Sequence, residues 1–215
     1  MSSSNRLGII GSSGGSALAA AAECLLTVNS DQTWCVVTDR ECGISDWAKT
    51  HAAAMVQINY QDSRSFSEEA LHFFSKQGVS GILLFYTRRV DAQLIDNIKT
   101  YNIHPSLLPA FPGLGAVKKA LRAGLDDIGA TLHRVDRTFD TGPILLQTST
   151  TISPSCTLEL AERVSFVQKT WLTLHWCEMM ATGASAVHPL SDELAKAFFR
   201  FQKELGCRAI AEPDA

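Results

Sequence analysis

The stretch YNIHPSLLPAFPG, Tyr101 to Gly113, marks the point at which the pattern of the chain changes. Upstream of it, short apolar segments alternate with longer segments in which apolar residues recur at helical spacing. The segments expected to be strands are 6–10, 34–39, 55–59, 79–86 and 101–104. The segments expected to be helices are 17–27, 45–54, 65–77 and 90–99. Such alternation is typical of a parallel sheet with helices on both faces.

Downstream of Gly113 the pattern is different. Two long apolar segments, 128–136 and 142–152, follow one another with only a tight connection between them, so we expect an antiparallel pair. Further helices are expected at 116–123, 158–182 and 192–205. The sequence therefore predicts an α/β fold, with a Rossmann-like, mostly parallel central sheet flanked by helices and with C-terminal helices. We expect one domain over residues 1–185 and a C-terminal helical extension over 186–215 that packs on it.

The composition is that of a globular protein of 215 residues, with 46% hydrophobic and 19% charged residues. The formal net charge of −3 does not favour nucleic acid as a partner. The six cysteines are scattered without a CxxC pair, which is typical of reduced core thiols and not of a metal site. The chain shows no apolar run of membrane-spanning length and no signal peptide. We therefore expect a cytoplasmic protein with no metal and no membrane partner.

Two polar side chains lie within the quoted stretch. In an extended segment, residues two apart face the same side, so Asn102 and His104 are expected to project together while Ile103 faces the core. The prolines that follow restrict the chain, and a cis peptide bond between Leu108 and Pro109 is one conformation open to it. Ligands of open α/β sheets bind beyond the strand ends. The stretch therefore predicts a rigid polar pair that faces a ligand.

A second polar group occurs at residues 132–143, LHRVDRTFDTGP, where His133 and Asp140 are the candidates. Each polar residue also has an ordinary structural explanation, since asparagine and aspartate bind turns and histidine is often a hydrogen-bonded core residue. Together they suit the attack of an amine on a formyl carbon. Asn102 and a protonated His104 would stabilise the negative oxygen of the tetrahedral intermediate, and Asp140 would orient His104 or accept the amine proton. This chemistry requires no metal.

A glycine-rich turn, GSSGGS at residues 11–16, joins the first expected strand to the first expected helix. Backbone N–H groups at a helix N-terminus attract anions, and glycine allows a ligand to approach the backbone closely. The spacing matches neither of the common nucleotide-binding glycine motifs. Two interpretations follow, an anion-binding turn and a turn without a ligand.

The blocks NIHPSLLPAFPG and GATLHRVDRTFDTGPILLQ resemble the folate-dependent glycinamide ribonucleotide formyltransferases, and the resemblance spans roughly residues 7–167. It implies a Rossmann-like formyltransferase fold. It also implies transfer of a formyl group from the co-substrate 10-formyltetrahydrofolate to a primary amine, which in that family is usually glycinamide ribonucleotide of purine synthesis. By the family motif, Asn102, His104 and Asp140 are the catalytic residues and His133 supports them.

Weaker matches to the family imply two binding regions. The residues implied to bind the amine substrate are Gly15, Ser16, Arg64, Ile103 and Pro105. The residues implied to bind the folate are Phe85, Arg88, Val90 and Asp140. The pterin ring is expected to lie against residues 85–90 and the loop 137–140.

The chain departs from the family pattern at positions near the amine. Ala17 stands where the family turn usually has asparagine, which removes a side-chain hydrogen bond near the substrate phosphate. Gly115 and Ala116 replace residues that are commonly polar. Gln168 stands where the family typically has a substrate-binding glutamate, and the neighbouring Lys169 could serve an anion instead. These changes leave the formyl chemistry intact and leave the identity of the amine open.

Other functions suit parts of the same sequence pattern. Enzymes that hydrolyse the formyl donor resemble this fold, but they usually carry an added N-terminal domain and HHS where this chain has His104, Pro105 and Ser106. Formyltransferases that act on initiator tRNA or nucleotide sugars are usually longer. A non-catalytic homologue that binds folate or another metabolite, and a purely structural protein, are the remaining alternatives. The apolar run at 171–177 suits the core better than a dimer contact, and a homodimer is left open.

Overall fold

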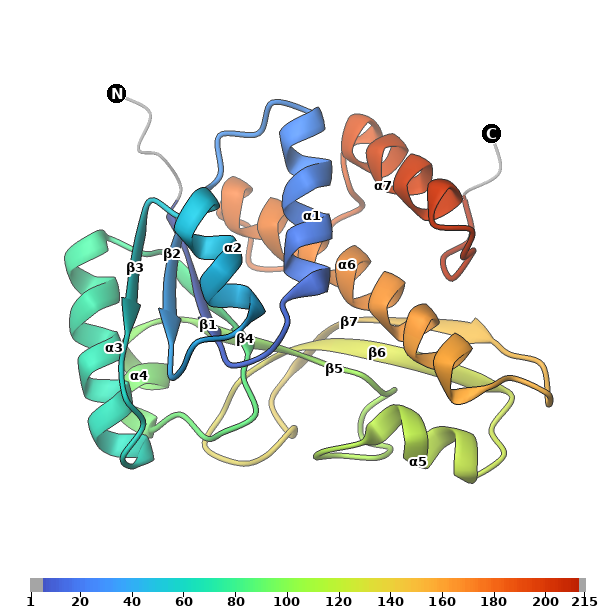
Figure 1. The fold of residues 1–215 in the computed structure, drawn as a ribbon, viewed down its shortest axis with the longest axis horizontal. Helices are drawn as coiled ribbons and strands as arrows, with labels where there is room; N and C mark the ends of the chain where they lie inside the picture. Colours follow the sequence, from blue (N-terminus) through green and yellow to red (C-terminus); the bar gives the residue numbers. More distant parts are fainter. Residues whose placement is uncertain (1–5, 213–215) are drawn as a thin grey trace.

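The computed structural model describes residues 6–212, which form one seven-stranded sheet in the order β3-β2-β1-β4-β5-β6-β7 (Figure 1). The strands are Arg6–Gly11 (β1), Thr33–Thr38 (β2), Ala54–Gln57 (β3), Gly81–Phe85 (β4), Thr100–His104 (β5), Asp127–Arg134 (β6) and Ile144–Thr151 (β7). Strands β1 to β5 run parallel, and β6 and β7 extend the sheet as antiparallel strands. The predicted mostly parallel sheet and the predicted antiparallel pair are both confirmed.

Helices cover both faces of the sheet. They are Ser16–Thr27 (α1), Gly43–His51 (α2), Ser63–Gln77 (α3), Ala92–Asn97 (α4), Ala116–Arg122 (α5), Leu158–Thr182 (α6) and Asp192–Glu204 (α7). Neighbouring residues of a strand point to opposite faces, so each strand contributes to two hydrophobic clusters. Leu7 and Ile9 of β1 belong to the larger cluster with α1, α6 and α7, whereas Ile10 belongs to the smaller cluster with α3 and α4.

Helix α6 is enclosed by the sheet and by other helices, which explains why apolar residues occur on several of its sides. Its Trp176 is fully buried and makes an edge contact with Tyr101 of β5, with 6.2 Å between the ring centroids. Trp171, on another side of α6, packs against Phe198 and Phe199 of α7. The run at 171–177 is therefore core, and α7 packs on both α1 and α6. The division of the chain at residue 185 stays a prediction.

Two helices end two or three residues before their expected ends. The helix predicted at 45–54 is α2, which ends at His51 because Ala52 is extended with ψ 142° and β3 begins two residues later. The helix predicted at 90–99 is α4, which begins after its N-cap Asp91 and ends before Ile98, where ψ is 132°. In both places the chain becomes extended early because it has to enter the next strand of the sheet.

All six cysteines are free thiols, and four of them are buried: Cys24, Cys35, Cys177 and Cys207. Within residues 6–212, no group of histidine, cysteine, aspartate or glutamate side chains could hold a metal ion. In the same part of the chain, no helix is both long enough and apolar enough to cross a membrane.

Candidate active site

The candidate site lies on the paired strands β5 and β6, at the end of β5. Asn102 and His104 project from the same face of β5, since both side chains reach Asp140. Asn102 lies directly opposite His133 of β6, and opposite residues of an antiparallel pair are close neighbours. Ile103 points to the other face, where it is buried in the larger cluster. The predicted orientation of the polar pair is therefore confirmed.

Asp140 comes from the loop between β6 and β7, with a backbone φ of 52° that aspartate tolerates better than most residues. Its side chain is only 9% exposed. One carboxylate oxygen, Oδ2, accepts a hydrogen bond from the Gly113 backbone N–H at 2.9 Å and lies 3.3 Å from His104 Nδ1. The other, Oδ1, accepts from Asn102 Nδ2 at 3.5 Å. The structure thus brings the three predicted catalytic residues into one contact set.

Both ring nitrogens of His104 face hydrogen-bond acceptors. Nε2 lies 2.8 Å from the backbone carbonyl oxygen of Phe111, and a carbonyl can only accept, so Nε2 carries a proton. Nδ1 faces the Asp140 carboxylate at 3.3 Å. The doubly protonated imidazolium is the form that donates at both positions. His104 is 5% exposed, so its ring is enclosed by these protein groups and not by water.

The contacts of His133 favour a neutral ring. Its Nδ1 lies 3.2 Å from the Arg134 carbonyl oxygen and donates to it, which leaves the Nε2 lone pair to accept from Asn102 Nδ2 at 3.2 Å. Burial lowers the pKa of His133 below its ordinary value of 6.5, in agreement with a neutral ring. The 3.7 Å separation of its Nε2 from Asp140 is therefore not an ion pair. His133 thus contacts the Asn102 amide, and its supporting role in catalysis stays a prediction.

Two buried histidines, His133 and His175, lead us to expect a loss of stability in mild acid. Burial lowers the pKa of both His133 and His175 below 6.5. Below that value the unfolded chain takes up protons that the folded histidines do not, so the free energy of unfolding falls as the pH falls. We expect the Tm, followed by differential scanning fluorimetry, to decrease steadily from about pH 7.5 to about pH 5.5.

Substitution at His175 separates this effect from other titrations. Its Nδ1 lies 3.0 Å from the His188 carbonyl oxygen, and the His175→Asn side chain keeps a donor there without titrating in this range. The variant should show a shallower pH dependence, whereas His72→Asn, at an exposed position of α3, should match the wild type. A Tm that does not change over this range would contradict the prediction.

The segment expected to bind folate lies beside the glycine-rich turn. The Ser12 N–H donates to the Phe85 carbonyl at 3.1 Å, and the hydroxyls of Ser12 and Thr87 are 3.4 Å apart. Arg88 points to Asp39 beyond the end of β2, with 3.0 Å between its Nε and Asp39 Oδ2. The Arg88 guanidinium also lies 4.3 Å from the centroid of the Tyr60 ring. The structure shows no contact between Arg88 and the Asn102–Asp140 set, so its folate contact stays a prediction.

Arg89, its neighbour, reaches the loop that carries Asp140. Its guanidinium lies 4.3 Å from the centroid of the Phe139 ring, and Phe139 is 52% exposed. The two segments expected to flank the pterin are thereby joined by a cation–π contact. Neither residue was singled out from the sequence, although an exposed aromatic residue next to a candidate catalytic aspartate is a usable signal. Val90, also expected to bind folate, packs partly buried in the smaller cluster.

The residues expected to bind the amine are spread over several elements. Gly15 has φ 69°, and a Cβ there would lie 2.3 Å from Ile44 Cγ1, so this position requires glycine. No side chain caps the start of α1, which leaves backbone donors near Ser16 for an anion. Arg64 is exposed on α3, and Pro105 follows β5 directly. The contacts in the structure do not join Gly15, Ser16 or Arg64 to the catalytic set, so their roles stay predictions.

Gln168 is turned into the fold and is fully buried. Its Nε2 donates to the Ile128 carbonyl at 3.0 Å and to Thr150 Oγ1 at 2.8 Å. The Thr150 hydroxyl in turn donates to the Ala209 carbonyl at 2.5 Å, on the segment that follows α7. The position where the family typically has a substrate-binding glutamate therefore links α6, β6, β7 and the C-terminal segment. Sequence comparison alone could not show this, because it does not reveal which way a side chain points.

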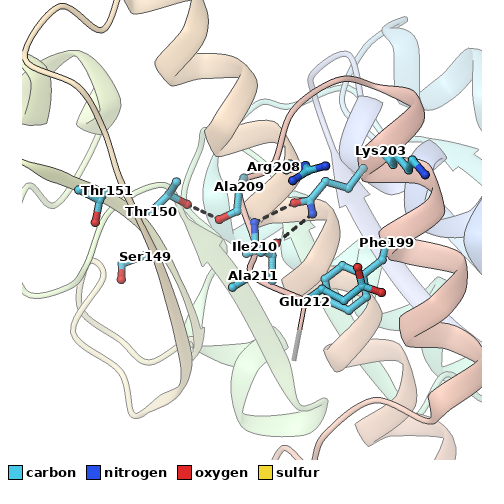
Figure 2. A pocket seen from close by; sticks show the side chains of 11 residues that line it. Ser149, Thr150, Thr151, Phe199, Lys203, Arg208, Ala209, Ile210, Ala211 and Glu212 are labelled. Atoms are coloured by element: carbon cyan, nitrogen blue, oxygen red, sulfur yellow. Dashed lines mark hydrogen bonds between the residues drawn. The ribbon is translucent and has the colours of Figure 1, made fainter. Parts of the chain in front are cut away.

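Figure 2 shows the surroundings of that link, a pocket of about 540 Å³ between β7 and the end of α7. Gln202 closes one side of it through two hydrogen bonds with the Ile210 backbone, at 2.7 and 2.9 Å. None of the catalytic residues lines this pocket. Burial lowers the pKa of Lys169, the neighbour of Gln168 that could serve an anion.

A family model described as Formyl transferase matches residues 5–175. The chain is 38% identical over 117 residues to the phosphoribosylglycinamide formyltransferase of Bacillus subtilis, covering 53% of this chain and 60% of that protein. It is 31% identical over 151 residues to the chloroplastic phosphoribosylglycinamide formyltransferase of Arabidopsis thaliana, covering 64% of this chain and 52% of that protein. The matches thus span between half and two-thirds of these curated relatives.

The similarity to solved structures covers more of this chain than the similarity to the curated relatives. The glycinamide ribonucleotide transformylase 1 of Symbiobacterium toebii superposes with a TM-score of 0.76 at 27% identity, covering 85% of this chain and 90% of that one. A formyltetrahydrofolate deformylase of Pseudomonas syringae superposes with a TM-score of 0.75 at 21% identity, covering 87% of this chain and 64% of that one. The second likeness shows a shared fold only.

Proposed function

The chain belongs to the formyl transferase family, and from this membership we propose that it transfers a formyl group from 10-formyltetrahydrofolate to a primary amine, glycinamide ribonucleotide. The observation that carries the proposal is the contact set of Asn102, His104 and Asp140, in which one carboxylate meets an amide and an imidazole ring. Both curated relatives described above bear the name of that activity.

In the proposed reaction the amine nitrogen attacks the formyl carbon, and the formyl oxygen takes the negative charge of the tetrahedral intermediate. The His104 imidazolium supplies positive potential to that oxygen, and an Asn102 N–H can turn to it because its contact with Asp140 is long, at 3.5 Å. The Asp140 carboxylate accepts the proton that the amine loses, directly or through water. The intermediate collapses as the folate nitrogen leaves and takes up a proton.

A different primary amine is the second candidate acceptor, because Gln168 faces the interior of the fold and presents no carboxylate to a substrate. Ala17, which has no hydrogen-bonding side chain, is buried at the start of α1. Both features concern the amine and not the formyl donor, so the formyl chemistry is common to the two candidates.

A spectrophotometric assay of 10-formyl folate consumption, with and without glycinamide ribonucleotide, tests the proposal. Consumption that requires the ribonucleotide supports it. Consumption without any amine indicates hydrolysis of the donor. If neither tube shows consumption, folate binding followed by a screen of primary amines separates a different acceptor from a binding protein.

We also propose that the protein works in the cytoplasm without a nucleic-acid or membrane partner. The net charge of −3 and six free thiols support this. The homodimer that the sequence leaves open is tested by size-exclusion chromatography with light scattering, since the mass of one chain is 23.4 kDa.

A further inference from the structure

A threonine that no motif singled out lies in the same row of the sheet as His104. Thr131 of β6 is directly opposite His104 of β5, and Gln147 of β7 is directly opposite Thr131. The three residues therefore form one lateral row across three strands. Thr131 and His133 are two apart in β6, so they share the face that carries the catalytic set. Thr131 is fully buried, whereas Gln147 lies on the exposed edge strand.

The hydroxyl of Thr131 has all of its hydrogen-bonding capacity in use. It donates to the Ser106 carbonyl at 2.6 Å and accepts from the Leu108 N–H at 3.0 Å and from Gln147 Nε2 at 2.9 Å. A hydroxyl has one proton and two lone pairs, so no further bond is available. The Gln147 amide also donates to the Leu108 carbonyl at 3.0 Å. The turn that follows His104 is thereby attached to β6 and β7 at both Ser106 and Leu108.

The same turn carries the group that binds His104. The Ser106 hydroxyl donates to the Ala110 carbonyl at 2.5 Å, and the Ala110 N–H donates to the Leu107 carbonyl at 3.0 Å. The next residue, Phe111, has φ 53° and places its carbonyl 2.8 Å from His104 Nε2. The position of that carbonyl therefore depends on the turn that Thr131 holds.

A glycine supports the same arrangement. A Cβ at Gly129, two residues before Thr131, would lie 2.5 Å from Leu107 Cδ2. Leu107 thus packs closely on this part of β6. The turn is seated on the strand by close packing at Gly129 and by hydrogen bonds at Thr131.

We propose that Thr131, supported by Gln147, is a positioning residue of the site, which fixes the turn 106–110 so that the Phe111 carbonyl holds the His104 ring against Asp140. Thr131 acts through the turn and not on the substrate. Its loss should therefore reduce kcat more than it changes KM, because the orientation of His104 matters most at the developing oxyanion. The kinetic part of this inference rests on the proposed formyl transfer, whereas the position of the His104 ring does not.

The test compares Thr131→Val, which keeps the shape and removes the hydroxyl, with Thr131→Ser, which keeps the hydroxyl. We expect Thr131→Val to lower kcat about tenfold or more with KM for both substrates within about twofold, and Thr131→Ser to stay within about threefold of the wild type. Thr170→Val is the matched control, since Thr170 is also fully buried and donates one hydrogen bond, to the Phe166 carbonyl within α6. It should leave kcat unchanged.

A spectroscopic measurement makes the test independent of turnover. With ¹⁵N-labelled histidine, the wild type should give a slowly exchanging Nε2–H signal for His104, assigned by its absence in His104→Ala. This signal should be lost or shifted in Thr131→Val and kept in Thr131→Ser and Thr170→Val. If the wild type transfers no formyl group to any amine, the proposed function fails and this signal still decides the role of Thr131.

Three results would overturn the inference. They are an unchanged signal and kcat in Thr131→Val, an equal loss in Thr131→Ser, and an equal loss in Thr170→Val. If Thr131→Val does not fold, Gln147→Met removes the supporting amide at an exposed position and should lower kcat about threefold. Ser149→Ala, also exposed on β7, is its control, and equal rates in these two variants would also overturn the inference.

Discussion

The variant Asp140→Asn is expected to fold normally and to lose between about 10²- and 10⁴-fold in kcat. Asparagine tolerates the φ of 52° at this position, and its carbonyl can still accept from the Gly113 N–H. It carries no charge to hold a protonated His104 and has no site that takes up the proton of the amine. The loss should therefore appear in kcat, measured by donor consumption with glycinamide ribonucleotide, while the Tm stays close to that of the wild type.

A neighbouring carboxylate provides the control for Asp140. Asp96 pairs with Arg137 of the same loop at 2.7 Å, but both side chains are at least half exposed, so this ion pair contributes little. Asp96→Asn should keep the kcat of the wild type. A rate in Asp140→Asn within about threefold of the wild type would remove Asp140 from the mechanism, since a general base accounts for far more than that.

The variant Gly142→Ala is expected to lower the free energy of unfolding by about 2 to 4 kcal/mol. Gly142 is buried beside the end of β6, and a Cβ there would lie 1.8 Å from the Arg134 carbonyl oxygen. No side-chain rotation relieves a contact with backbone, so the chain itself must move. Asp140 is two residues away, and its displacement should also abolish turnover. Urea denaturation followed by circular dichroism measures the stability.

Gly14→Ala is the matched control for this substitution. A Cβ at Gly14 meets no atom within 4 Å, so the same chemical change should cost little stability. Equal denaturation midpoints for Gly142→Ala and the wild type would show that the loop between β6 and β7 adapts without cost. In that case the placement of Asp140 would not depend on the glycine.

The elements of the fold follow largely from local patterns in the sequence. The apolar segments of β1, β2 and β4 are buried on both faces, as parallel strands covered by helices should be, and both ends of α6 lie where they were predicted. The predicted ends of α2 and α4 were wrong by a few residues. There the chain has to enter the next strand of the sheet. Helix propensity is a local property and does not reflect this tertiary requirement.

The candidate site was predicted only in part. The spacing of Asn102 and His104 determines that they face the same side, because alternation along a strand is a local property. The orientation of Gln168 and the partner of Arg88 could not be predicted. Both depend on groups from distant parts of the chain, because Gln168 donates a hydrogen bond to Thr150 and Arg88 forms an ion pair with Asp39.

The sequence by itself therefore determined the alternation of strands and helices, the polar pair at the end of β5 and the turn-rich loop around Asp140. Only the tertiary structure decided that Asp140 meets a residue 38 positions earlier, and that Thr131 and Gln147 hold the turn behind His104. The physical reason is the distance along the chain over which each effect acts. Propensity and periodicity act over a few residues, whereas strand order and register decide which distant side chains share one row of a sheet.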